Sequence, residues 1–408
     1  MNITIISIIL PYPLTSGGAQ GIFNMVDAHR KHHRITFIYP AYNNNSPKAQ
    51  KELQKLWPEV TFKAYPYSRQ LSYIPFAWAK AKRAMKLLFI PNKPSFQIER
   101  FLRPYGYCIT KDFVRFIKKS LQEDRPDIVQ VEFYPYLKLA DSLPDDVKRV
   151  FVHHEIRYVR NMRFAEHLPL TQKDKKLLNT LKDEEIKDLN KYDTVIVMTD
   201  IDKKDLEKSG VTATIKVSPS AINTPTLPYT RWNNSVVFIG GFSHTPNQEG
   251  IKWFLQEVVP VVTQNTPFTL TIVGKGWSEE YLKTINPAGI PIEVKGFVED
   301  LGSVVHNAIS IVPILSGSGM RMKILEAAAL GSPIITTTVG IEGIDMYNAS
   351  VVADSPKEFA NGLIRLLTQE SLRKNLCQAA TEIYTEKYSR DSLTRKRENI
   401  YNELIQNK

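Results

Sequence analysis

The residues best suited to chemistry lie in one stretch, GSGMRMKILEAAALGSP, at residues 317–333. Its first residues, Gly317, Ser318 and Gly319, form a loop whose backbone amides can approach a ligand closely, because two of the three carry no Cβ. Good helix formers follow from about Met320, so this loop opens a helix. The free amides and the positive end of the helix dipole predict an anion-binding site at this position.

Two charged side chains follow within this helix. Lys323 lies one turn in and adds positive charge that suits phosphate groups. Glu326, three residues later, lies on the same helix face, and its carboxylate can accept hydrogen bonds from two adjacent hydroxyls, such as those of a ribose. The set predicts a nucleotide diphosphate ligand, with the amides and Lys323 on phosphate and Glu326 on sugar. The alternative is a solvated Lys323–Glu326 pair on an ordinary surface helix.

The same stretch resembles the donor-binding segment of glycosyltransferase family 4, retaining GT-B enzymes that use nucleotide sugars, in the subgroup with a Gly-Ser-Gly loop followed by Arg, Lys and Ile-Leu-Glu-Ala. The resemblance covers most of residues 235–345, and the amino-terminal half in outline. It implies an α/β fold of two Rossmann-like domains with parallel sheets facing a central cleft. Many members carry two glutamates eight positions apart. Glu326 matches the second, and Ser318 stands in place of the first, so we expect the amides of Gly317 to Met320 to replace it.

Length and composition bound the class of protein. A chain of 408 residues predicts two domains, and 43% hydrophobic and 23% charged residues are typical of a soluble globular protein. Cys108 and Cys377 form no metal pattern or disulfide framework, as expected in a reducing cytoplasm. The apolar run at residues 3–10 is too short to span a membrane and no basic residue precedes it, so we expect a buried strand there and not a signal peptide.

The positive charge of the chain is concentrated in one region. The formal net charge is +11, and thirteen Lys or Arg between Lys63 and Lys119 face two acidic residues. Residues 75–90 within it have the pattern of an amphipathic helix with a basic face. We therefore predict that residues 75–119 contact an anionic inner-membrane face or an acidic acceptor. The alternatives are a solvated surface helix and single-stranded nucleic acid, but no nucleic-acid-binding motif is present and no such partner is expected.

The first strand, at residues 2–10, runs into PYPLTSGGAQG and a helix that we expect to end near His32. This strand, glycine loop and helix lack the full dinucleotide fingerprint, which argues against an NAD site. In the family that the chain resembles, the loop lies at the interdomain cleft. The resemblance therefore makes Gly17 and Gly18 candidates for contact with donor phosphate or acceptor. A tight turn without a binding role is the alternative.

A strand predicted at residues 149–152 ends in His153-His154-Glu155. Polar residues at the carboxyl end of a parallel strand lie where open α/β sheets bind ligands. HEIRYVR resembles the family's strand-end histidine, which implies that His154 lies near the donor sugar and the acceptor. His153 is the second candidate, since neighbouring side chains of a strand point in opposite directions. A structural role is the alternative for either histidine.

The domain boundary is predicted at residues 223–234, which are rich in Pro, Thr and Asn and lack periodicity. We expect residues 1–222 to form the acceptor-side domain and residues 235–388 to form the donor-binding domain. In GT-B enzymes the last helix crosses back to the first domain, so the resemblance predicts the same for residues 389–408.

The second domain repeats the pattern of strand, glycine loop and helix, here with Gly240 and Gly241. Family members often carry a cation in this loop. In this chain His244 and Asn247 are the polar candidates, and Arg321 is the candidate for the missing charge, with an exposed arginine as the alternative. The resemblance also assigns Phe297 and Val298 to the nucleotide base, contacted largely through backbone.

Together these residues predict a retaining, metal-independent glycosyltransferase of the hexosyltransferase type, with His154, Lys323 and Glu326 as catalytic residues. A nucleotide diphosphate sugar is the expected donor, a glycan or lipid-linked saccharide the expected acceptor, and no cofactor or metal is expected. The expected role is cell-surface polysaccharide synthesis, in the cytoplasm or on the inner membrane face. Alternatives are a nucleotide-sugar epimerase, a phosphorylase with pyridoxal phosphate, and a non-catalytic basic module that binds membrane or nucleic acid. The donor base, the sugar and the oligomeric state stay open.

Overall fold

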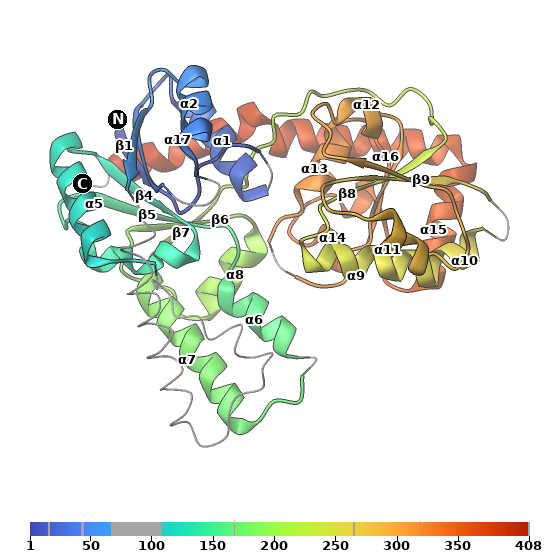
Figure 1. Cartoon of the computed structure of the whole chain (residues 1–408), viewed down its shortest axis with the longest axis horizontal. Coiled ribbons are helices and arrows are strands. Elements are labelled where there is room, and N and C mark those ends of the chain that lie inside the picture. Colours follow the sequence, from blue (N-terminus) through green and yellow to red (C-terminus); the bar gives the residue numbers. More distant parts are fainter. Residues whose placement is uncertain are drawn as a thin grey trace. The chain divides into compact units, whose positions relative to one another are not determined.

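The computed structural model describes residues 1–14, 17–41, 45–66, 108–166, 168–263, 266–317 and 319–406 (Figure 1). The helix predicted at residues 75–90, and Ser318, lie outside these ranges. The chain divides into two compact units: unit 1 comprises Met1–Ser220 with Thr394–Lys408, and unit 2 comprises Ala221–Leu393. No helix in the described ranges is long and apolar enough to cross a bilayer.

Unit 1 is built on a parallel sheet of seven strands in the order β3-β2-β1-β4-β5-β6-β7. Its central strands are mostly apolar and are buried on both faces, as a parallel sheet covered by helices requires. The strands are β1 (Asn2–Ile6), β2 (Arg34–Pro40), β3 (Thr61–Tyr65), β4 (Ile128–Glu132), β5 (Lys148–His153), β6 (Thr194–Val197) and β7 (Thr214–Val217). The helices are α1 (Gly17–His29), α2 (Pro47–Leu56), α5 (Lys111–Asp124), the 3-10 helix Tyr134–Ser142, α6 (Arg157–Ala165), α7 (Gln172–Leu189) and α8 (Asp200–Lys208).

Unit 2 is built on a parallel sheet of six strands in the order β10-β9-β8-β11-β12-β13. The strands are β8 (Ser235–Ile239), β9 (Thr269–Val273), β10 (Ile292–Gly296), β11 (Ile309–Val312), β12 (Ile334–Thr336) and β13 (Val351–Val352). The helices are α9 (Thr245–Trp253), α10 (Val259–Val262), α11 (Glu279–Thr284), α12 (Gly302–Val305), α13 (Met322–Ala329), α14 (Thr338–Ile341), α15 (Pro356–Thr368) and α16 (Glu370–Ile383). Residues 223–234, predicted as a linker, hydrogen-bond to this unit, for example from Leu227 N to Ala329 O over 2.7 Å.

The two sheets share one topology, and this topology locates the expected ligand sites. Each sheet runs outward from its first strand in both directions, so the order reverses between β1 and β4 in unit 1 and between β8 and β11 in unit 2. Open α/β sheets bind ligands beyond the carboxyl ends of the strands at such a reversal. The prediction of two Rossmann-like parallel-sheet domains is therefore confirmed, whereas a cleft between them stays a prediction.

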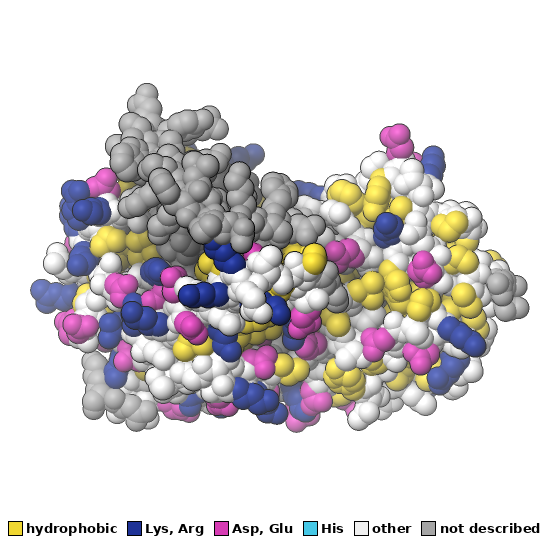
Figure 2. All heavy atoms as spheres, turned by 90° about the horizontal axis from the view of Figure 1, so that it is seen from below, with side chains coloured by type: hydrophobic (Ala, Val, Ile, Leu, Met, Phe, Trp, Pro, Cys, Tyr) yellow, Lys and Arg dark blue, Asp and Glu magenta, His cyan; other side chains and the backbone are white. Residues whose placement is uncertain are grey.

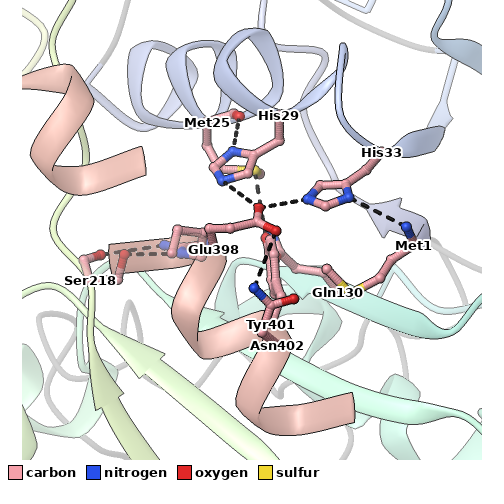
Figure 3. A network of polar contacts seen from close by, with 10 residues as sticks. Met1, Met25, His29, His33, Gln130, Ser218, Glu398, Tyr401 and Asn402 are labelled. Atoms are coloured by element: carbon pink, nitrogen blue, oxygen red, sulfur yellow. Dashed lines mark hydrogen bonds and ion pairs between the residues drawn. The ribbon is translucent and has the colours of Figure 1, made fainter. Parts of the chain in front are cut away.

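The helix α17 (Arg390–Gln406) completes unit 1 with its residues from Thr394 onward. Its side chains reach polar groups of the first 220 residues, as Figure 3 shows. Arg397 donates to the Ser218 hydroxyl over 3.0 Å, and Glu398 lies 2.7 Å from His33 Nε2. Tyr401 is fully buried in this network, so the end of the chain forms part of the interior of unit 1.

One expectation about unit 1 is wrong. Gly17 and Gly18 do not form a loop before a helix, because they are the first residues of α1, which ends at His29 and not near His32. A Cβ on Gly18 would come 3.0 Å from the ring of Phe133. Close packing of the helix against this ring, and not loop conformation, therefore accounts for glycine at position 18.

Close packing also fixes α9 of unit 2 beside the residue that follows β11. A Cβ on Gly250 of this helix would come 2.1 Å from the carbonyl oxygen of Pro313. We expect Gly250→Ala to lower the free energy of unfolding of unit 2 by about 1–3 kcal/mol, the usual cost of overpacking, although alanine is the better helix former. Urea unfolding followed by tryptophan fluorescence measures this difference.

Lys252 is exposed on the same helix and provides the control. Lys252→Ala should change the free energy of unfolding by less than about 0.5 kcal/mol. A Gly250→Ala protein as stable as the wild type would contradict the close packing of α9.

Candidate functional site

The glycine loop before α13 has two residues in a backbone conformation that favours glycine. Gly317 and Gly319 adopt φ angles of +103° and +83°, a region that residues with a Cβ enter at a cost. A Cβ on Gly317 would lie 3.4 Å from Pro246, so the first turn of α9 packs against this loop. The loop thus lies at the carboxyl end of β11, at the point where the strand order of unit 2 reverses.

Lys323 is held by contacts from two other elements of unit 2. Its Nζ donates a hydrogen bond to Asn247 Oδ1 over 2.8 Å and lies 4.4 Å from the ring centroid of Phe238 on β8. Asn247 Nδ2 in turn donates to the carbonyl of Gly241 over 2.9 Å. A Cβ on Gly240 would come 2.6 Å from this amide nitrogen. The glycine loop after β8 is therefore what allows Asn247 to reach and hold Lys323.

Glu326 lies one turn after Lys323 and is only 6% exposed. Burial raises the pKa of its carboxyl to about 7, against the attraction of Lys323. Burial of the ammonium likewise lowers the pKa of Lys323 to about 7, against the attraction of Glu326. The alternative of a solvated surface pair is wrong. Two groups with pKa values near neutrality in one place are typical of functional sites.

Arg321 and His244 differ in their surroundings. Arg321 is buried, and its Nη1 donates to the carbonyl of Gly319 in the same loop, so the alternative of an exposed arginine is also wrong. His244 is exposed and is the residue that precedes α9. The cation that Asn247 contacts is thus the half-buried Lys323, contributed by the helix after β11 and not by the loop after β8.

Phe297 and Val298 follow β10, the edge strand of the sheet of unit 2. Phe297 is 54% exposed, and Lys275 Nζ lies 5.0 Å from its ring centroid. Val298 packs instead against a small apolar cluster that contains Val237 and Leu330. The aromatic ring is therefore presented to solvent while the neighbouring valine anchors the segment.

In unit 1 the structure brings together residues from the ends of β4 and β5 and the start of α1. His154 Nε2 lies 2.6 Å from Glu132 Oε2, and the ring of Phe133 stacks on His154 at 4.3 Å between centroids. Gly18, at the start of α1, packs against the ring of Phe133. The His154 side chain is 14% exposed whereas that of Glu132 is 1% exposed, so the histidine is the accessible member of the pair.

His153 has the opposite character. It is 1% exposed, and its Nε2 lies 2.8 Å from Glu185 Oε1. The same carboxylate accepts hydrogen bonds from the backbone amides of Arg157 and Tyr158 over 3.0 and 2.9 Å, at the start of α6. These contacts indicate that His153 supports the fold. A structural role is the alternative given above for this histidine.

Sequence reasoning missed Glu132 and Phe133. Glu132 is the last residue of β4, and the strand-end argument that selected His154 applies to it equally. Phe133 has φ +68°, a conformation that no sequence pattern predicts for a phenylalanine. Neighbouring strand ends must be considered together for such a pair to be found.

Comparisons with known proteins bear on both units. Residues 233–369 match the family model described as Glycosyl transferases group 1. An uncharacterised 44.6 kDa protein in the cps region of Klebsiella pneumoniae is 30% identical over 166 residues, which are 38% of this chain and 43% of that protein. An uncharacterised glycosyltransferase of Methanocaldococcus jannaschii is 26% identical over 180 residues, 41% of this chain and 44% of that protein. The chain therefore matches less than half the length of either relative.

Solved structures resemble the whole chain. Sucrose-phosphate synthase from Thermosynechococcus elongatus has a TM-score of 0.72 at 14% identity, with 100% of both chains covered. HepE from Anabaena, in complex with UDP, has a TM-score of 0.67 at 12% identity, with 99% of this chain and 100% of that chain covered. At these identities the likeness shows the fold alone, two parallel-sheet α/β domains as in GT-B glycosyltransferases, in agreement with the sequence prediction.

The buried charges of unit 2 predict how its stability varies with pH. The pKa of Glu326 is raised from 4.5 to about 7 on folding, so its contribution to stability is present below pH 4.5 and is lost as the pH rises to about 7. The pKa of Lys323 is lowered from 10.5 to about 7, so its contribution is present above pH 10.5 and is lost as the pH falls to about 7. We expect these two groups to destabilise the unligated protein most near pH 7.

Thermal melts of wild type and variants from acid to alkaline pH test this expectation. Lys323→Met should raise the melting temperature at and below pH 7, with a difference that shrinks toward pH 10.5. Glu326→Gln should raise it at and above pH 7, with a difference that shrinks toward pH 4.5. Lys357 is exposed on α15, and Lys357→Met is the control. Differences that do not vary with pH for Lys323→Met or Glu326→Gln would show that these groups are not buried as described.

Proposed function

We propose that this chain is a retaining glycosyltransferase that moves a sugar from a nucleotide diphosphate sugar to a hydroxyl acceptor. The observation that carries the proposal is the buried arrangement in unit 2, where Asn247 holds Lys323 and Glu326 follows one turn later. The pKa of Lys323 is lowered to about 7. An anion that binds beside this amine raises its pKa again and so favours the protonated form. This behaviour suits a ligand that brings a diphosphate.

The proposed reaction breaks the bond between the sugar and the diphosphate, so negative charge develops on the leaving phosphate oxygen. The ammonium of Lys323 and the amides at the start of α13 would stabilise this charge from positions that are fixed before the reaction. These groups are the basis for proposing a metal-independent enzyme. Glu326 would accept hydrogen bonds from the ribose hydroxyls, and His154 of unit 1 would contact the transferred sugar or the acceptor.

The donor and acceptor classes are proposed from the comparisons. HepE is described in complex with UDP, and another structure of it in complex with UDP and glucose, so a UDP-hexose is the first donor to test. The Klebsiella relative lies in the cps region, which supports a glycan or lipid-linked acceptor in cell-surface polysaccharide synthesis. Retention at the anomeric carbon rests on the resemblance of residues 317–333 to family 4.

The donor site predicts a specific binding result. Thermal melts with a panel of UDP-, GDP-, ADP-, CMP- and dTDP-sugars should show a rise in melting temperature with one nucleotide class, UDP-sugars first, because a ligand that binds only the native state stabilises it by mass action. Glu326→Ala and Lys323→Met should abolish this rise.

Lys357→Met should respond to the nucleotide sugar as the wild type does, which separates loss of the site from loss of one positive charge. No response of the folded wild type to any member of the panel would contradict the proposal and favour a binding module. Conversion of the bound donor alone to an epimer would instead identify a nucleotide-sugar epimerase.

We also propose that residues 75–119 bring unit 1 to an anionic membrane surface. The charge of this region is the support: outside Lys63–Lys119 the chain is electrically balanced, and Figure 2 shows basic and acidic side chains interspersed over the described surface on one face. Replacing Lys80, Lys82, Arg83 and Lys86 by glutamine should weaken binding to vesicles that contain phosphatidylglycerol by up to roughly a thousandfold, since each surface cation contributes about 1 kcal/mol.

Sedimentation with vesicles measures this binding, and phosphatidylcholine vesicles should bind neither protein. The matched control removes four exposed lysines elsewhere in unit 1, which are Lys175, Lys176, Lys187 and Lys208. An equal loss in both quadruple variants would show that total charge, and not residues 75–119, determines the binding.

A further inference from the structure

A line of buried hydrogen bonds leads from His154 into the interior of unit 1. His154 Nε2 lies 2.6 Å from Glu132 Oε2, and Gln130 Nε2 donates to Glu132 Oε1 over 2.5 Å. The hydroxyl of Tyr401 on α17 donates to Gln130 Oε1 over 2.6 Å, and Figure 3 shows this end of the line, with Gln130 and Tyr401 labelled. Gln130 and Tyr401 are fully buried and Glu132 is 1% exposed.

Gln130 lies in the middle of this line, and the orientation of its amide determines the direction of the hydrogen bonds. With the amide nitrogen of Gln130 toward Glu132, both carboxylate oxygens of Glu132 accept, one from Gln130 and the other from His154 Nε2–H. If the amide were turned over, two acceptor oxygens would meet in a buried place, which is costly. The hydroxyl of Tyr401 favours the first orientation because it donates to the Gln130 oxygen.

A histidine whose Nε2–H donates to a carboxylate keeps Nδ1 free of a proton in its neutral form. We infer that Glu132 is a positioning residue that holds His154 in this tautomer, so that Nδ1 accepts a hydrogen bond from a substrate hydroxyl, and that Tyr401 holds Glu132 through Gln130. The substrate hydroxyl in this inference rests on the proposed function. The stacked ring of Phe133, 4.3 Å from that of His154, fixes the plane in which Nδ1 lies.

The neighbouring pair of His153 and Glu185 provides a matched control. It has the same chemistry, with His153 Nε2 2.8 Å from Glu185 Oε1, but the two side chains are only 1% and 0% exposed. Loss of the Glu185 carboxylate should therefore affect folding stability without altering the tautomer of His154.

The tautomer can be measured without any ligand. Nitrogen-15 NMR of protein labelled in its eight histidine rings reports which nitrogen carries the proton, and the loss of signals in His154→Ala assigns those of His154. We expect the wild type to be protonated on Nε2, and Glu132→Gln to show a mixture of tautomers. Tyr401→Phe removes a single oxygen and should shift the signals of His154 less in the same direction. It also tests the inference if Glu132→Gln does not fold.

Turnover gives the second readout, as release of UDP from UDP-glucose, or of the nucleotide from whichever donor the binding panel selects. Glu132→Gln should lower kcat about ten- to a hundredfold, the range found for groups that orient histidines in metal sites, and leave KM within about twofold. Glu185→Gln should lower the melting temperature and leave both constants unchanged.

Three results would overturn the inference. The first is a wild-type His154 protonated on Nδ1. The second is a tautomer that neither Glu132→Gln nor Tyr401→Phe alters, and the third is an equal loss of kcat in Glu132→Gln and Glu185→Gln. If the wild type turns over no nucleotide sugar, the proposed function fails, and the NMR comparison alone decides whether Glu132 positions His154.

Discussion

The contact between Lys323 and Asn247 is the interaction on which the geometry of the candidate site in unit 2 depends. A buried ammonium needs a hydrogen-bond acceptor, and Asn247 supplies it over 2.8 Å. Asn247 can do so because Gly240 leaves room for its amide and because Gly250 lets α9 lie against Pro313. The glycines after β8 and within α9 are therefore as much a part of the site as the charged residues.

Unit 1 has a similar arrangement around a group of opposite charge. Its reversal point holds a buried carboxylate, Glu132, whose oxygens are occupied by Gln130 and His154. In both units a charged or polar side chain of the candidate site is held by a hydrogen bond to a side chain from a neighbouring element of the same unit. This arrangement follows from parallel topology, which places the carboxyl ends of successive strands side by side.

The sequence predicted those features that depend on local pattern. The strand predicted at residues 149–152 lies within β5 (Lys148–His153), because a short apolar run is encoded within a few residues. The placing of Lys323 against Asn247 joins residues 76 positions apart, which no single-sequence pattern specifies. The sequence predicts a loop at Gly18 because glycine permits both loop conformation and close helix packing, and only the contact with Phe133 distinguishes the two.

The last helix adds a constraint that the first 220 residues cannot satisfy alone. Gln130 is fully buried on β4 and its side-chain oxygen is paired by Tyr401 of α17, while the Ser218 hydroxyl is paired by Arg397. Without α17 these groups would lose their partners, and a buried polar group without a partner is costly. The polar interior behind His154 is thus completed only when the end of the chain has folded onto unit 1, so the candidate site of the first domain depends on residues made after the whole of the second.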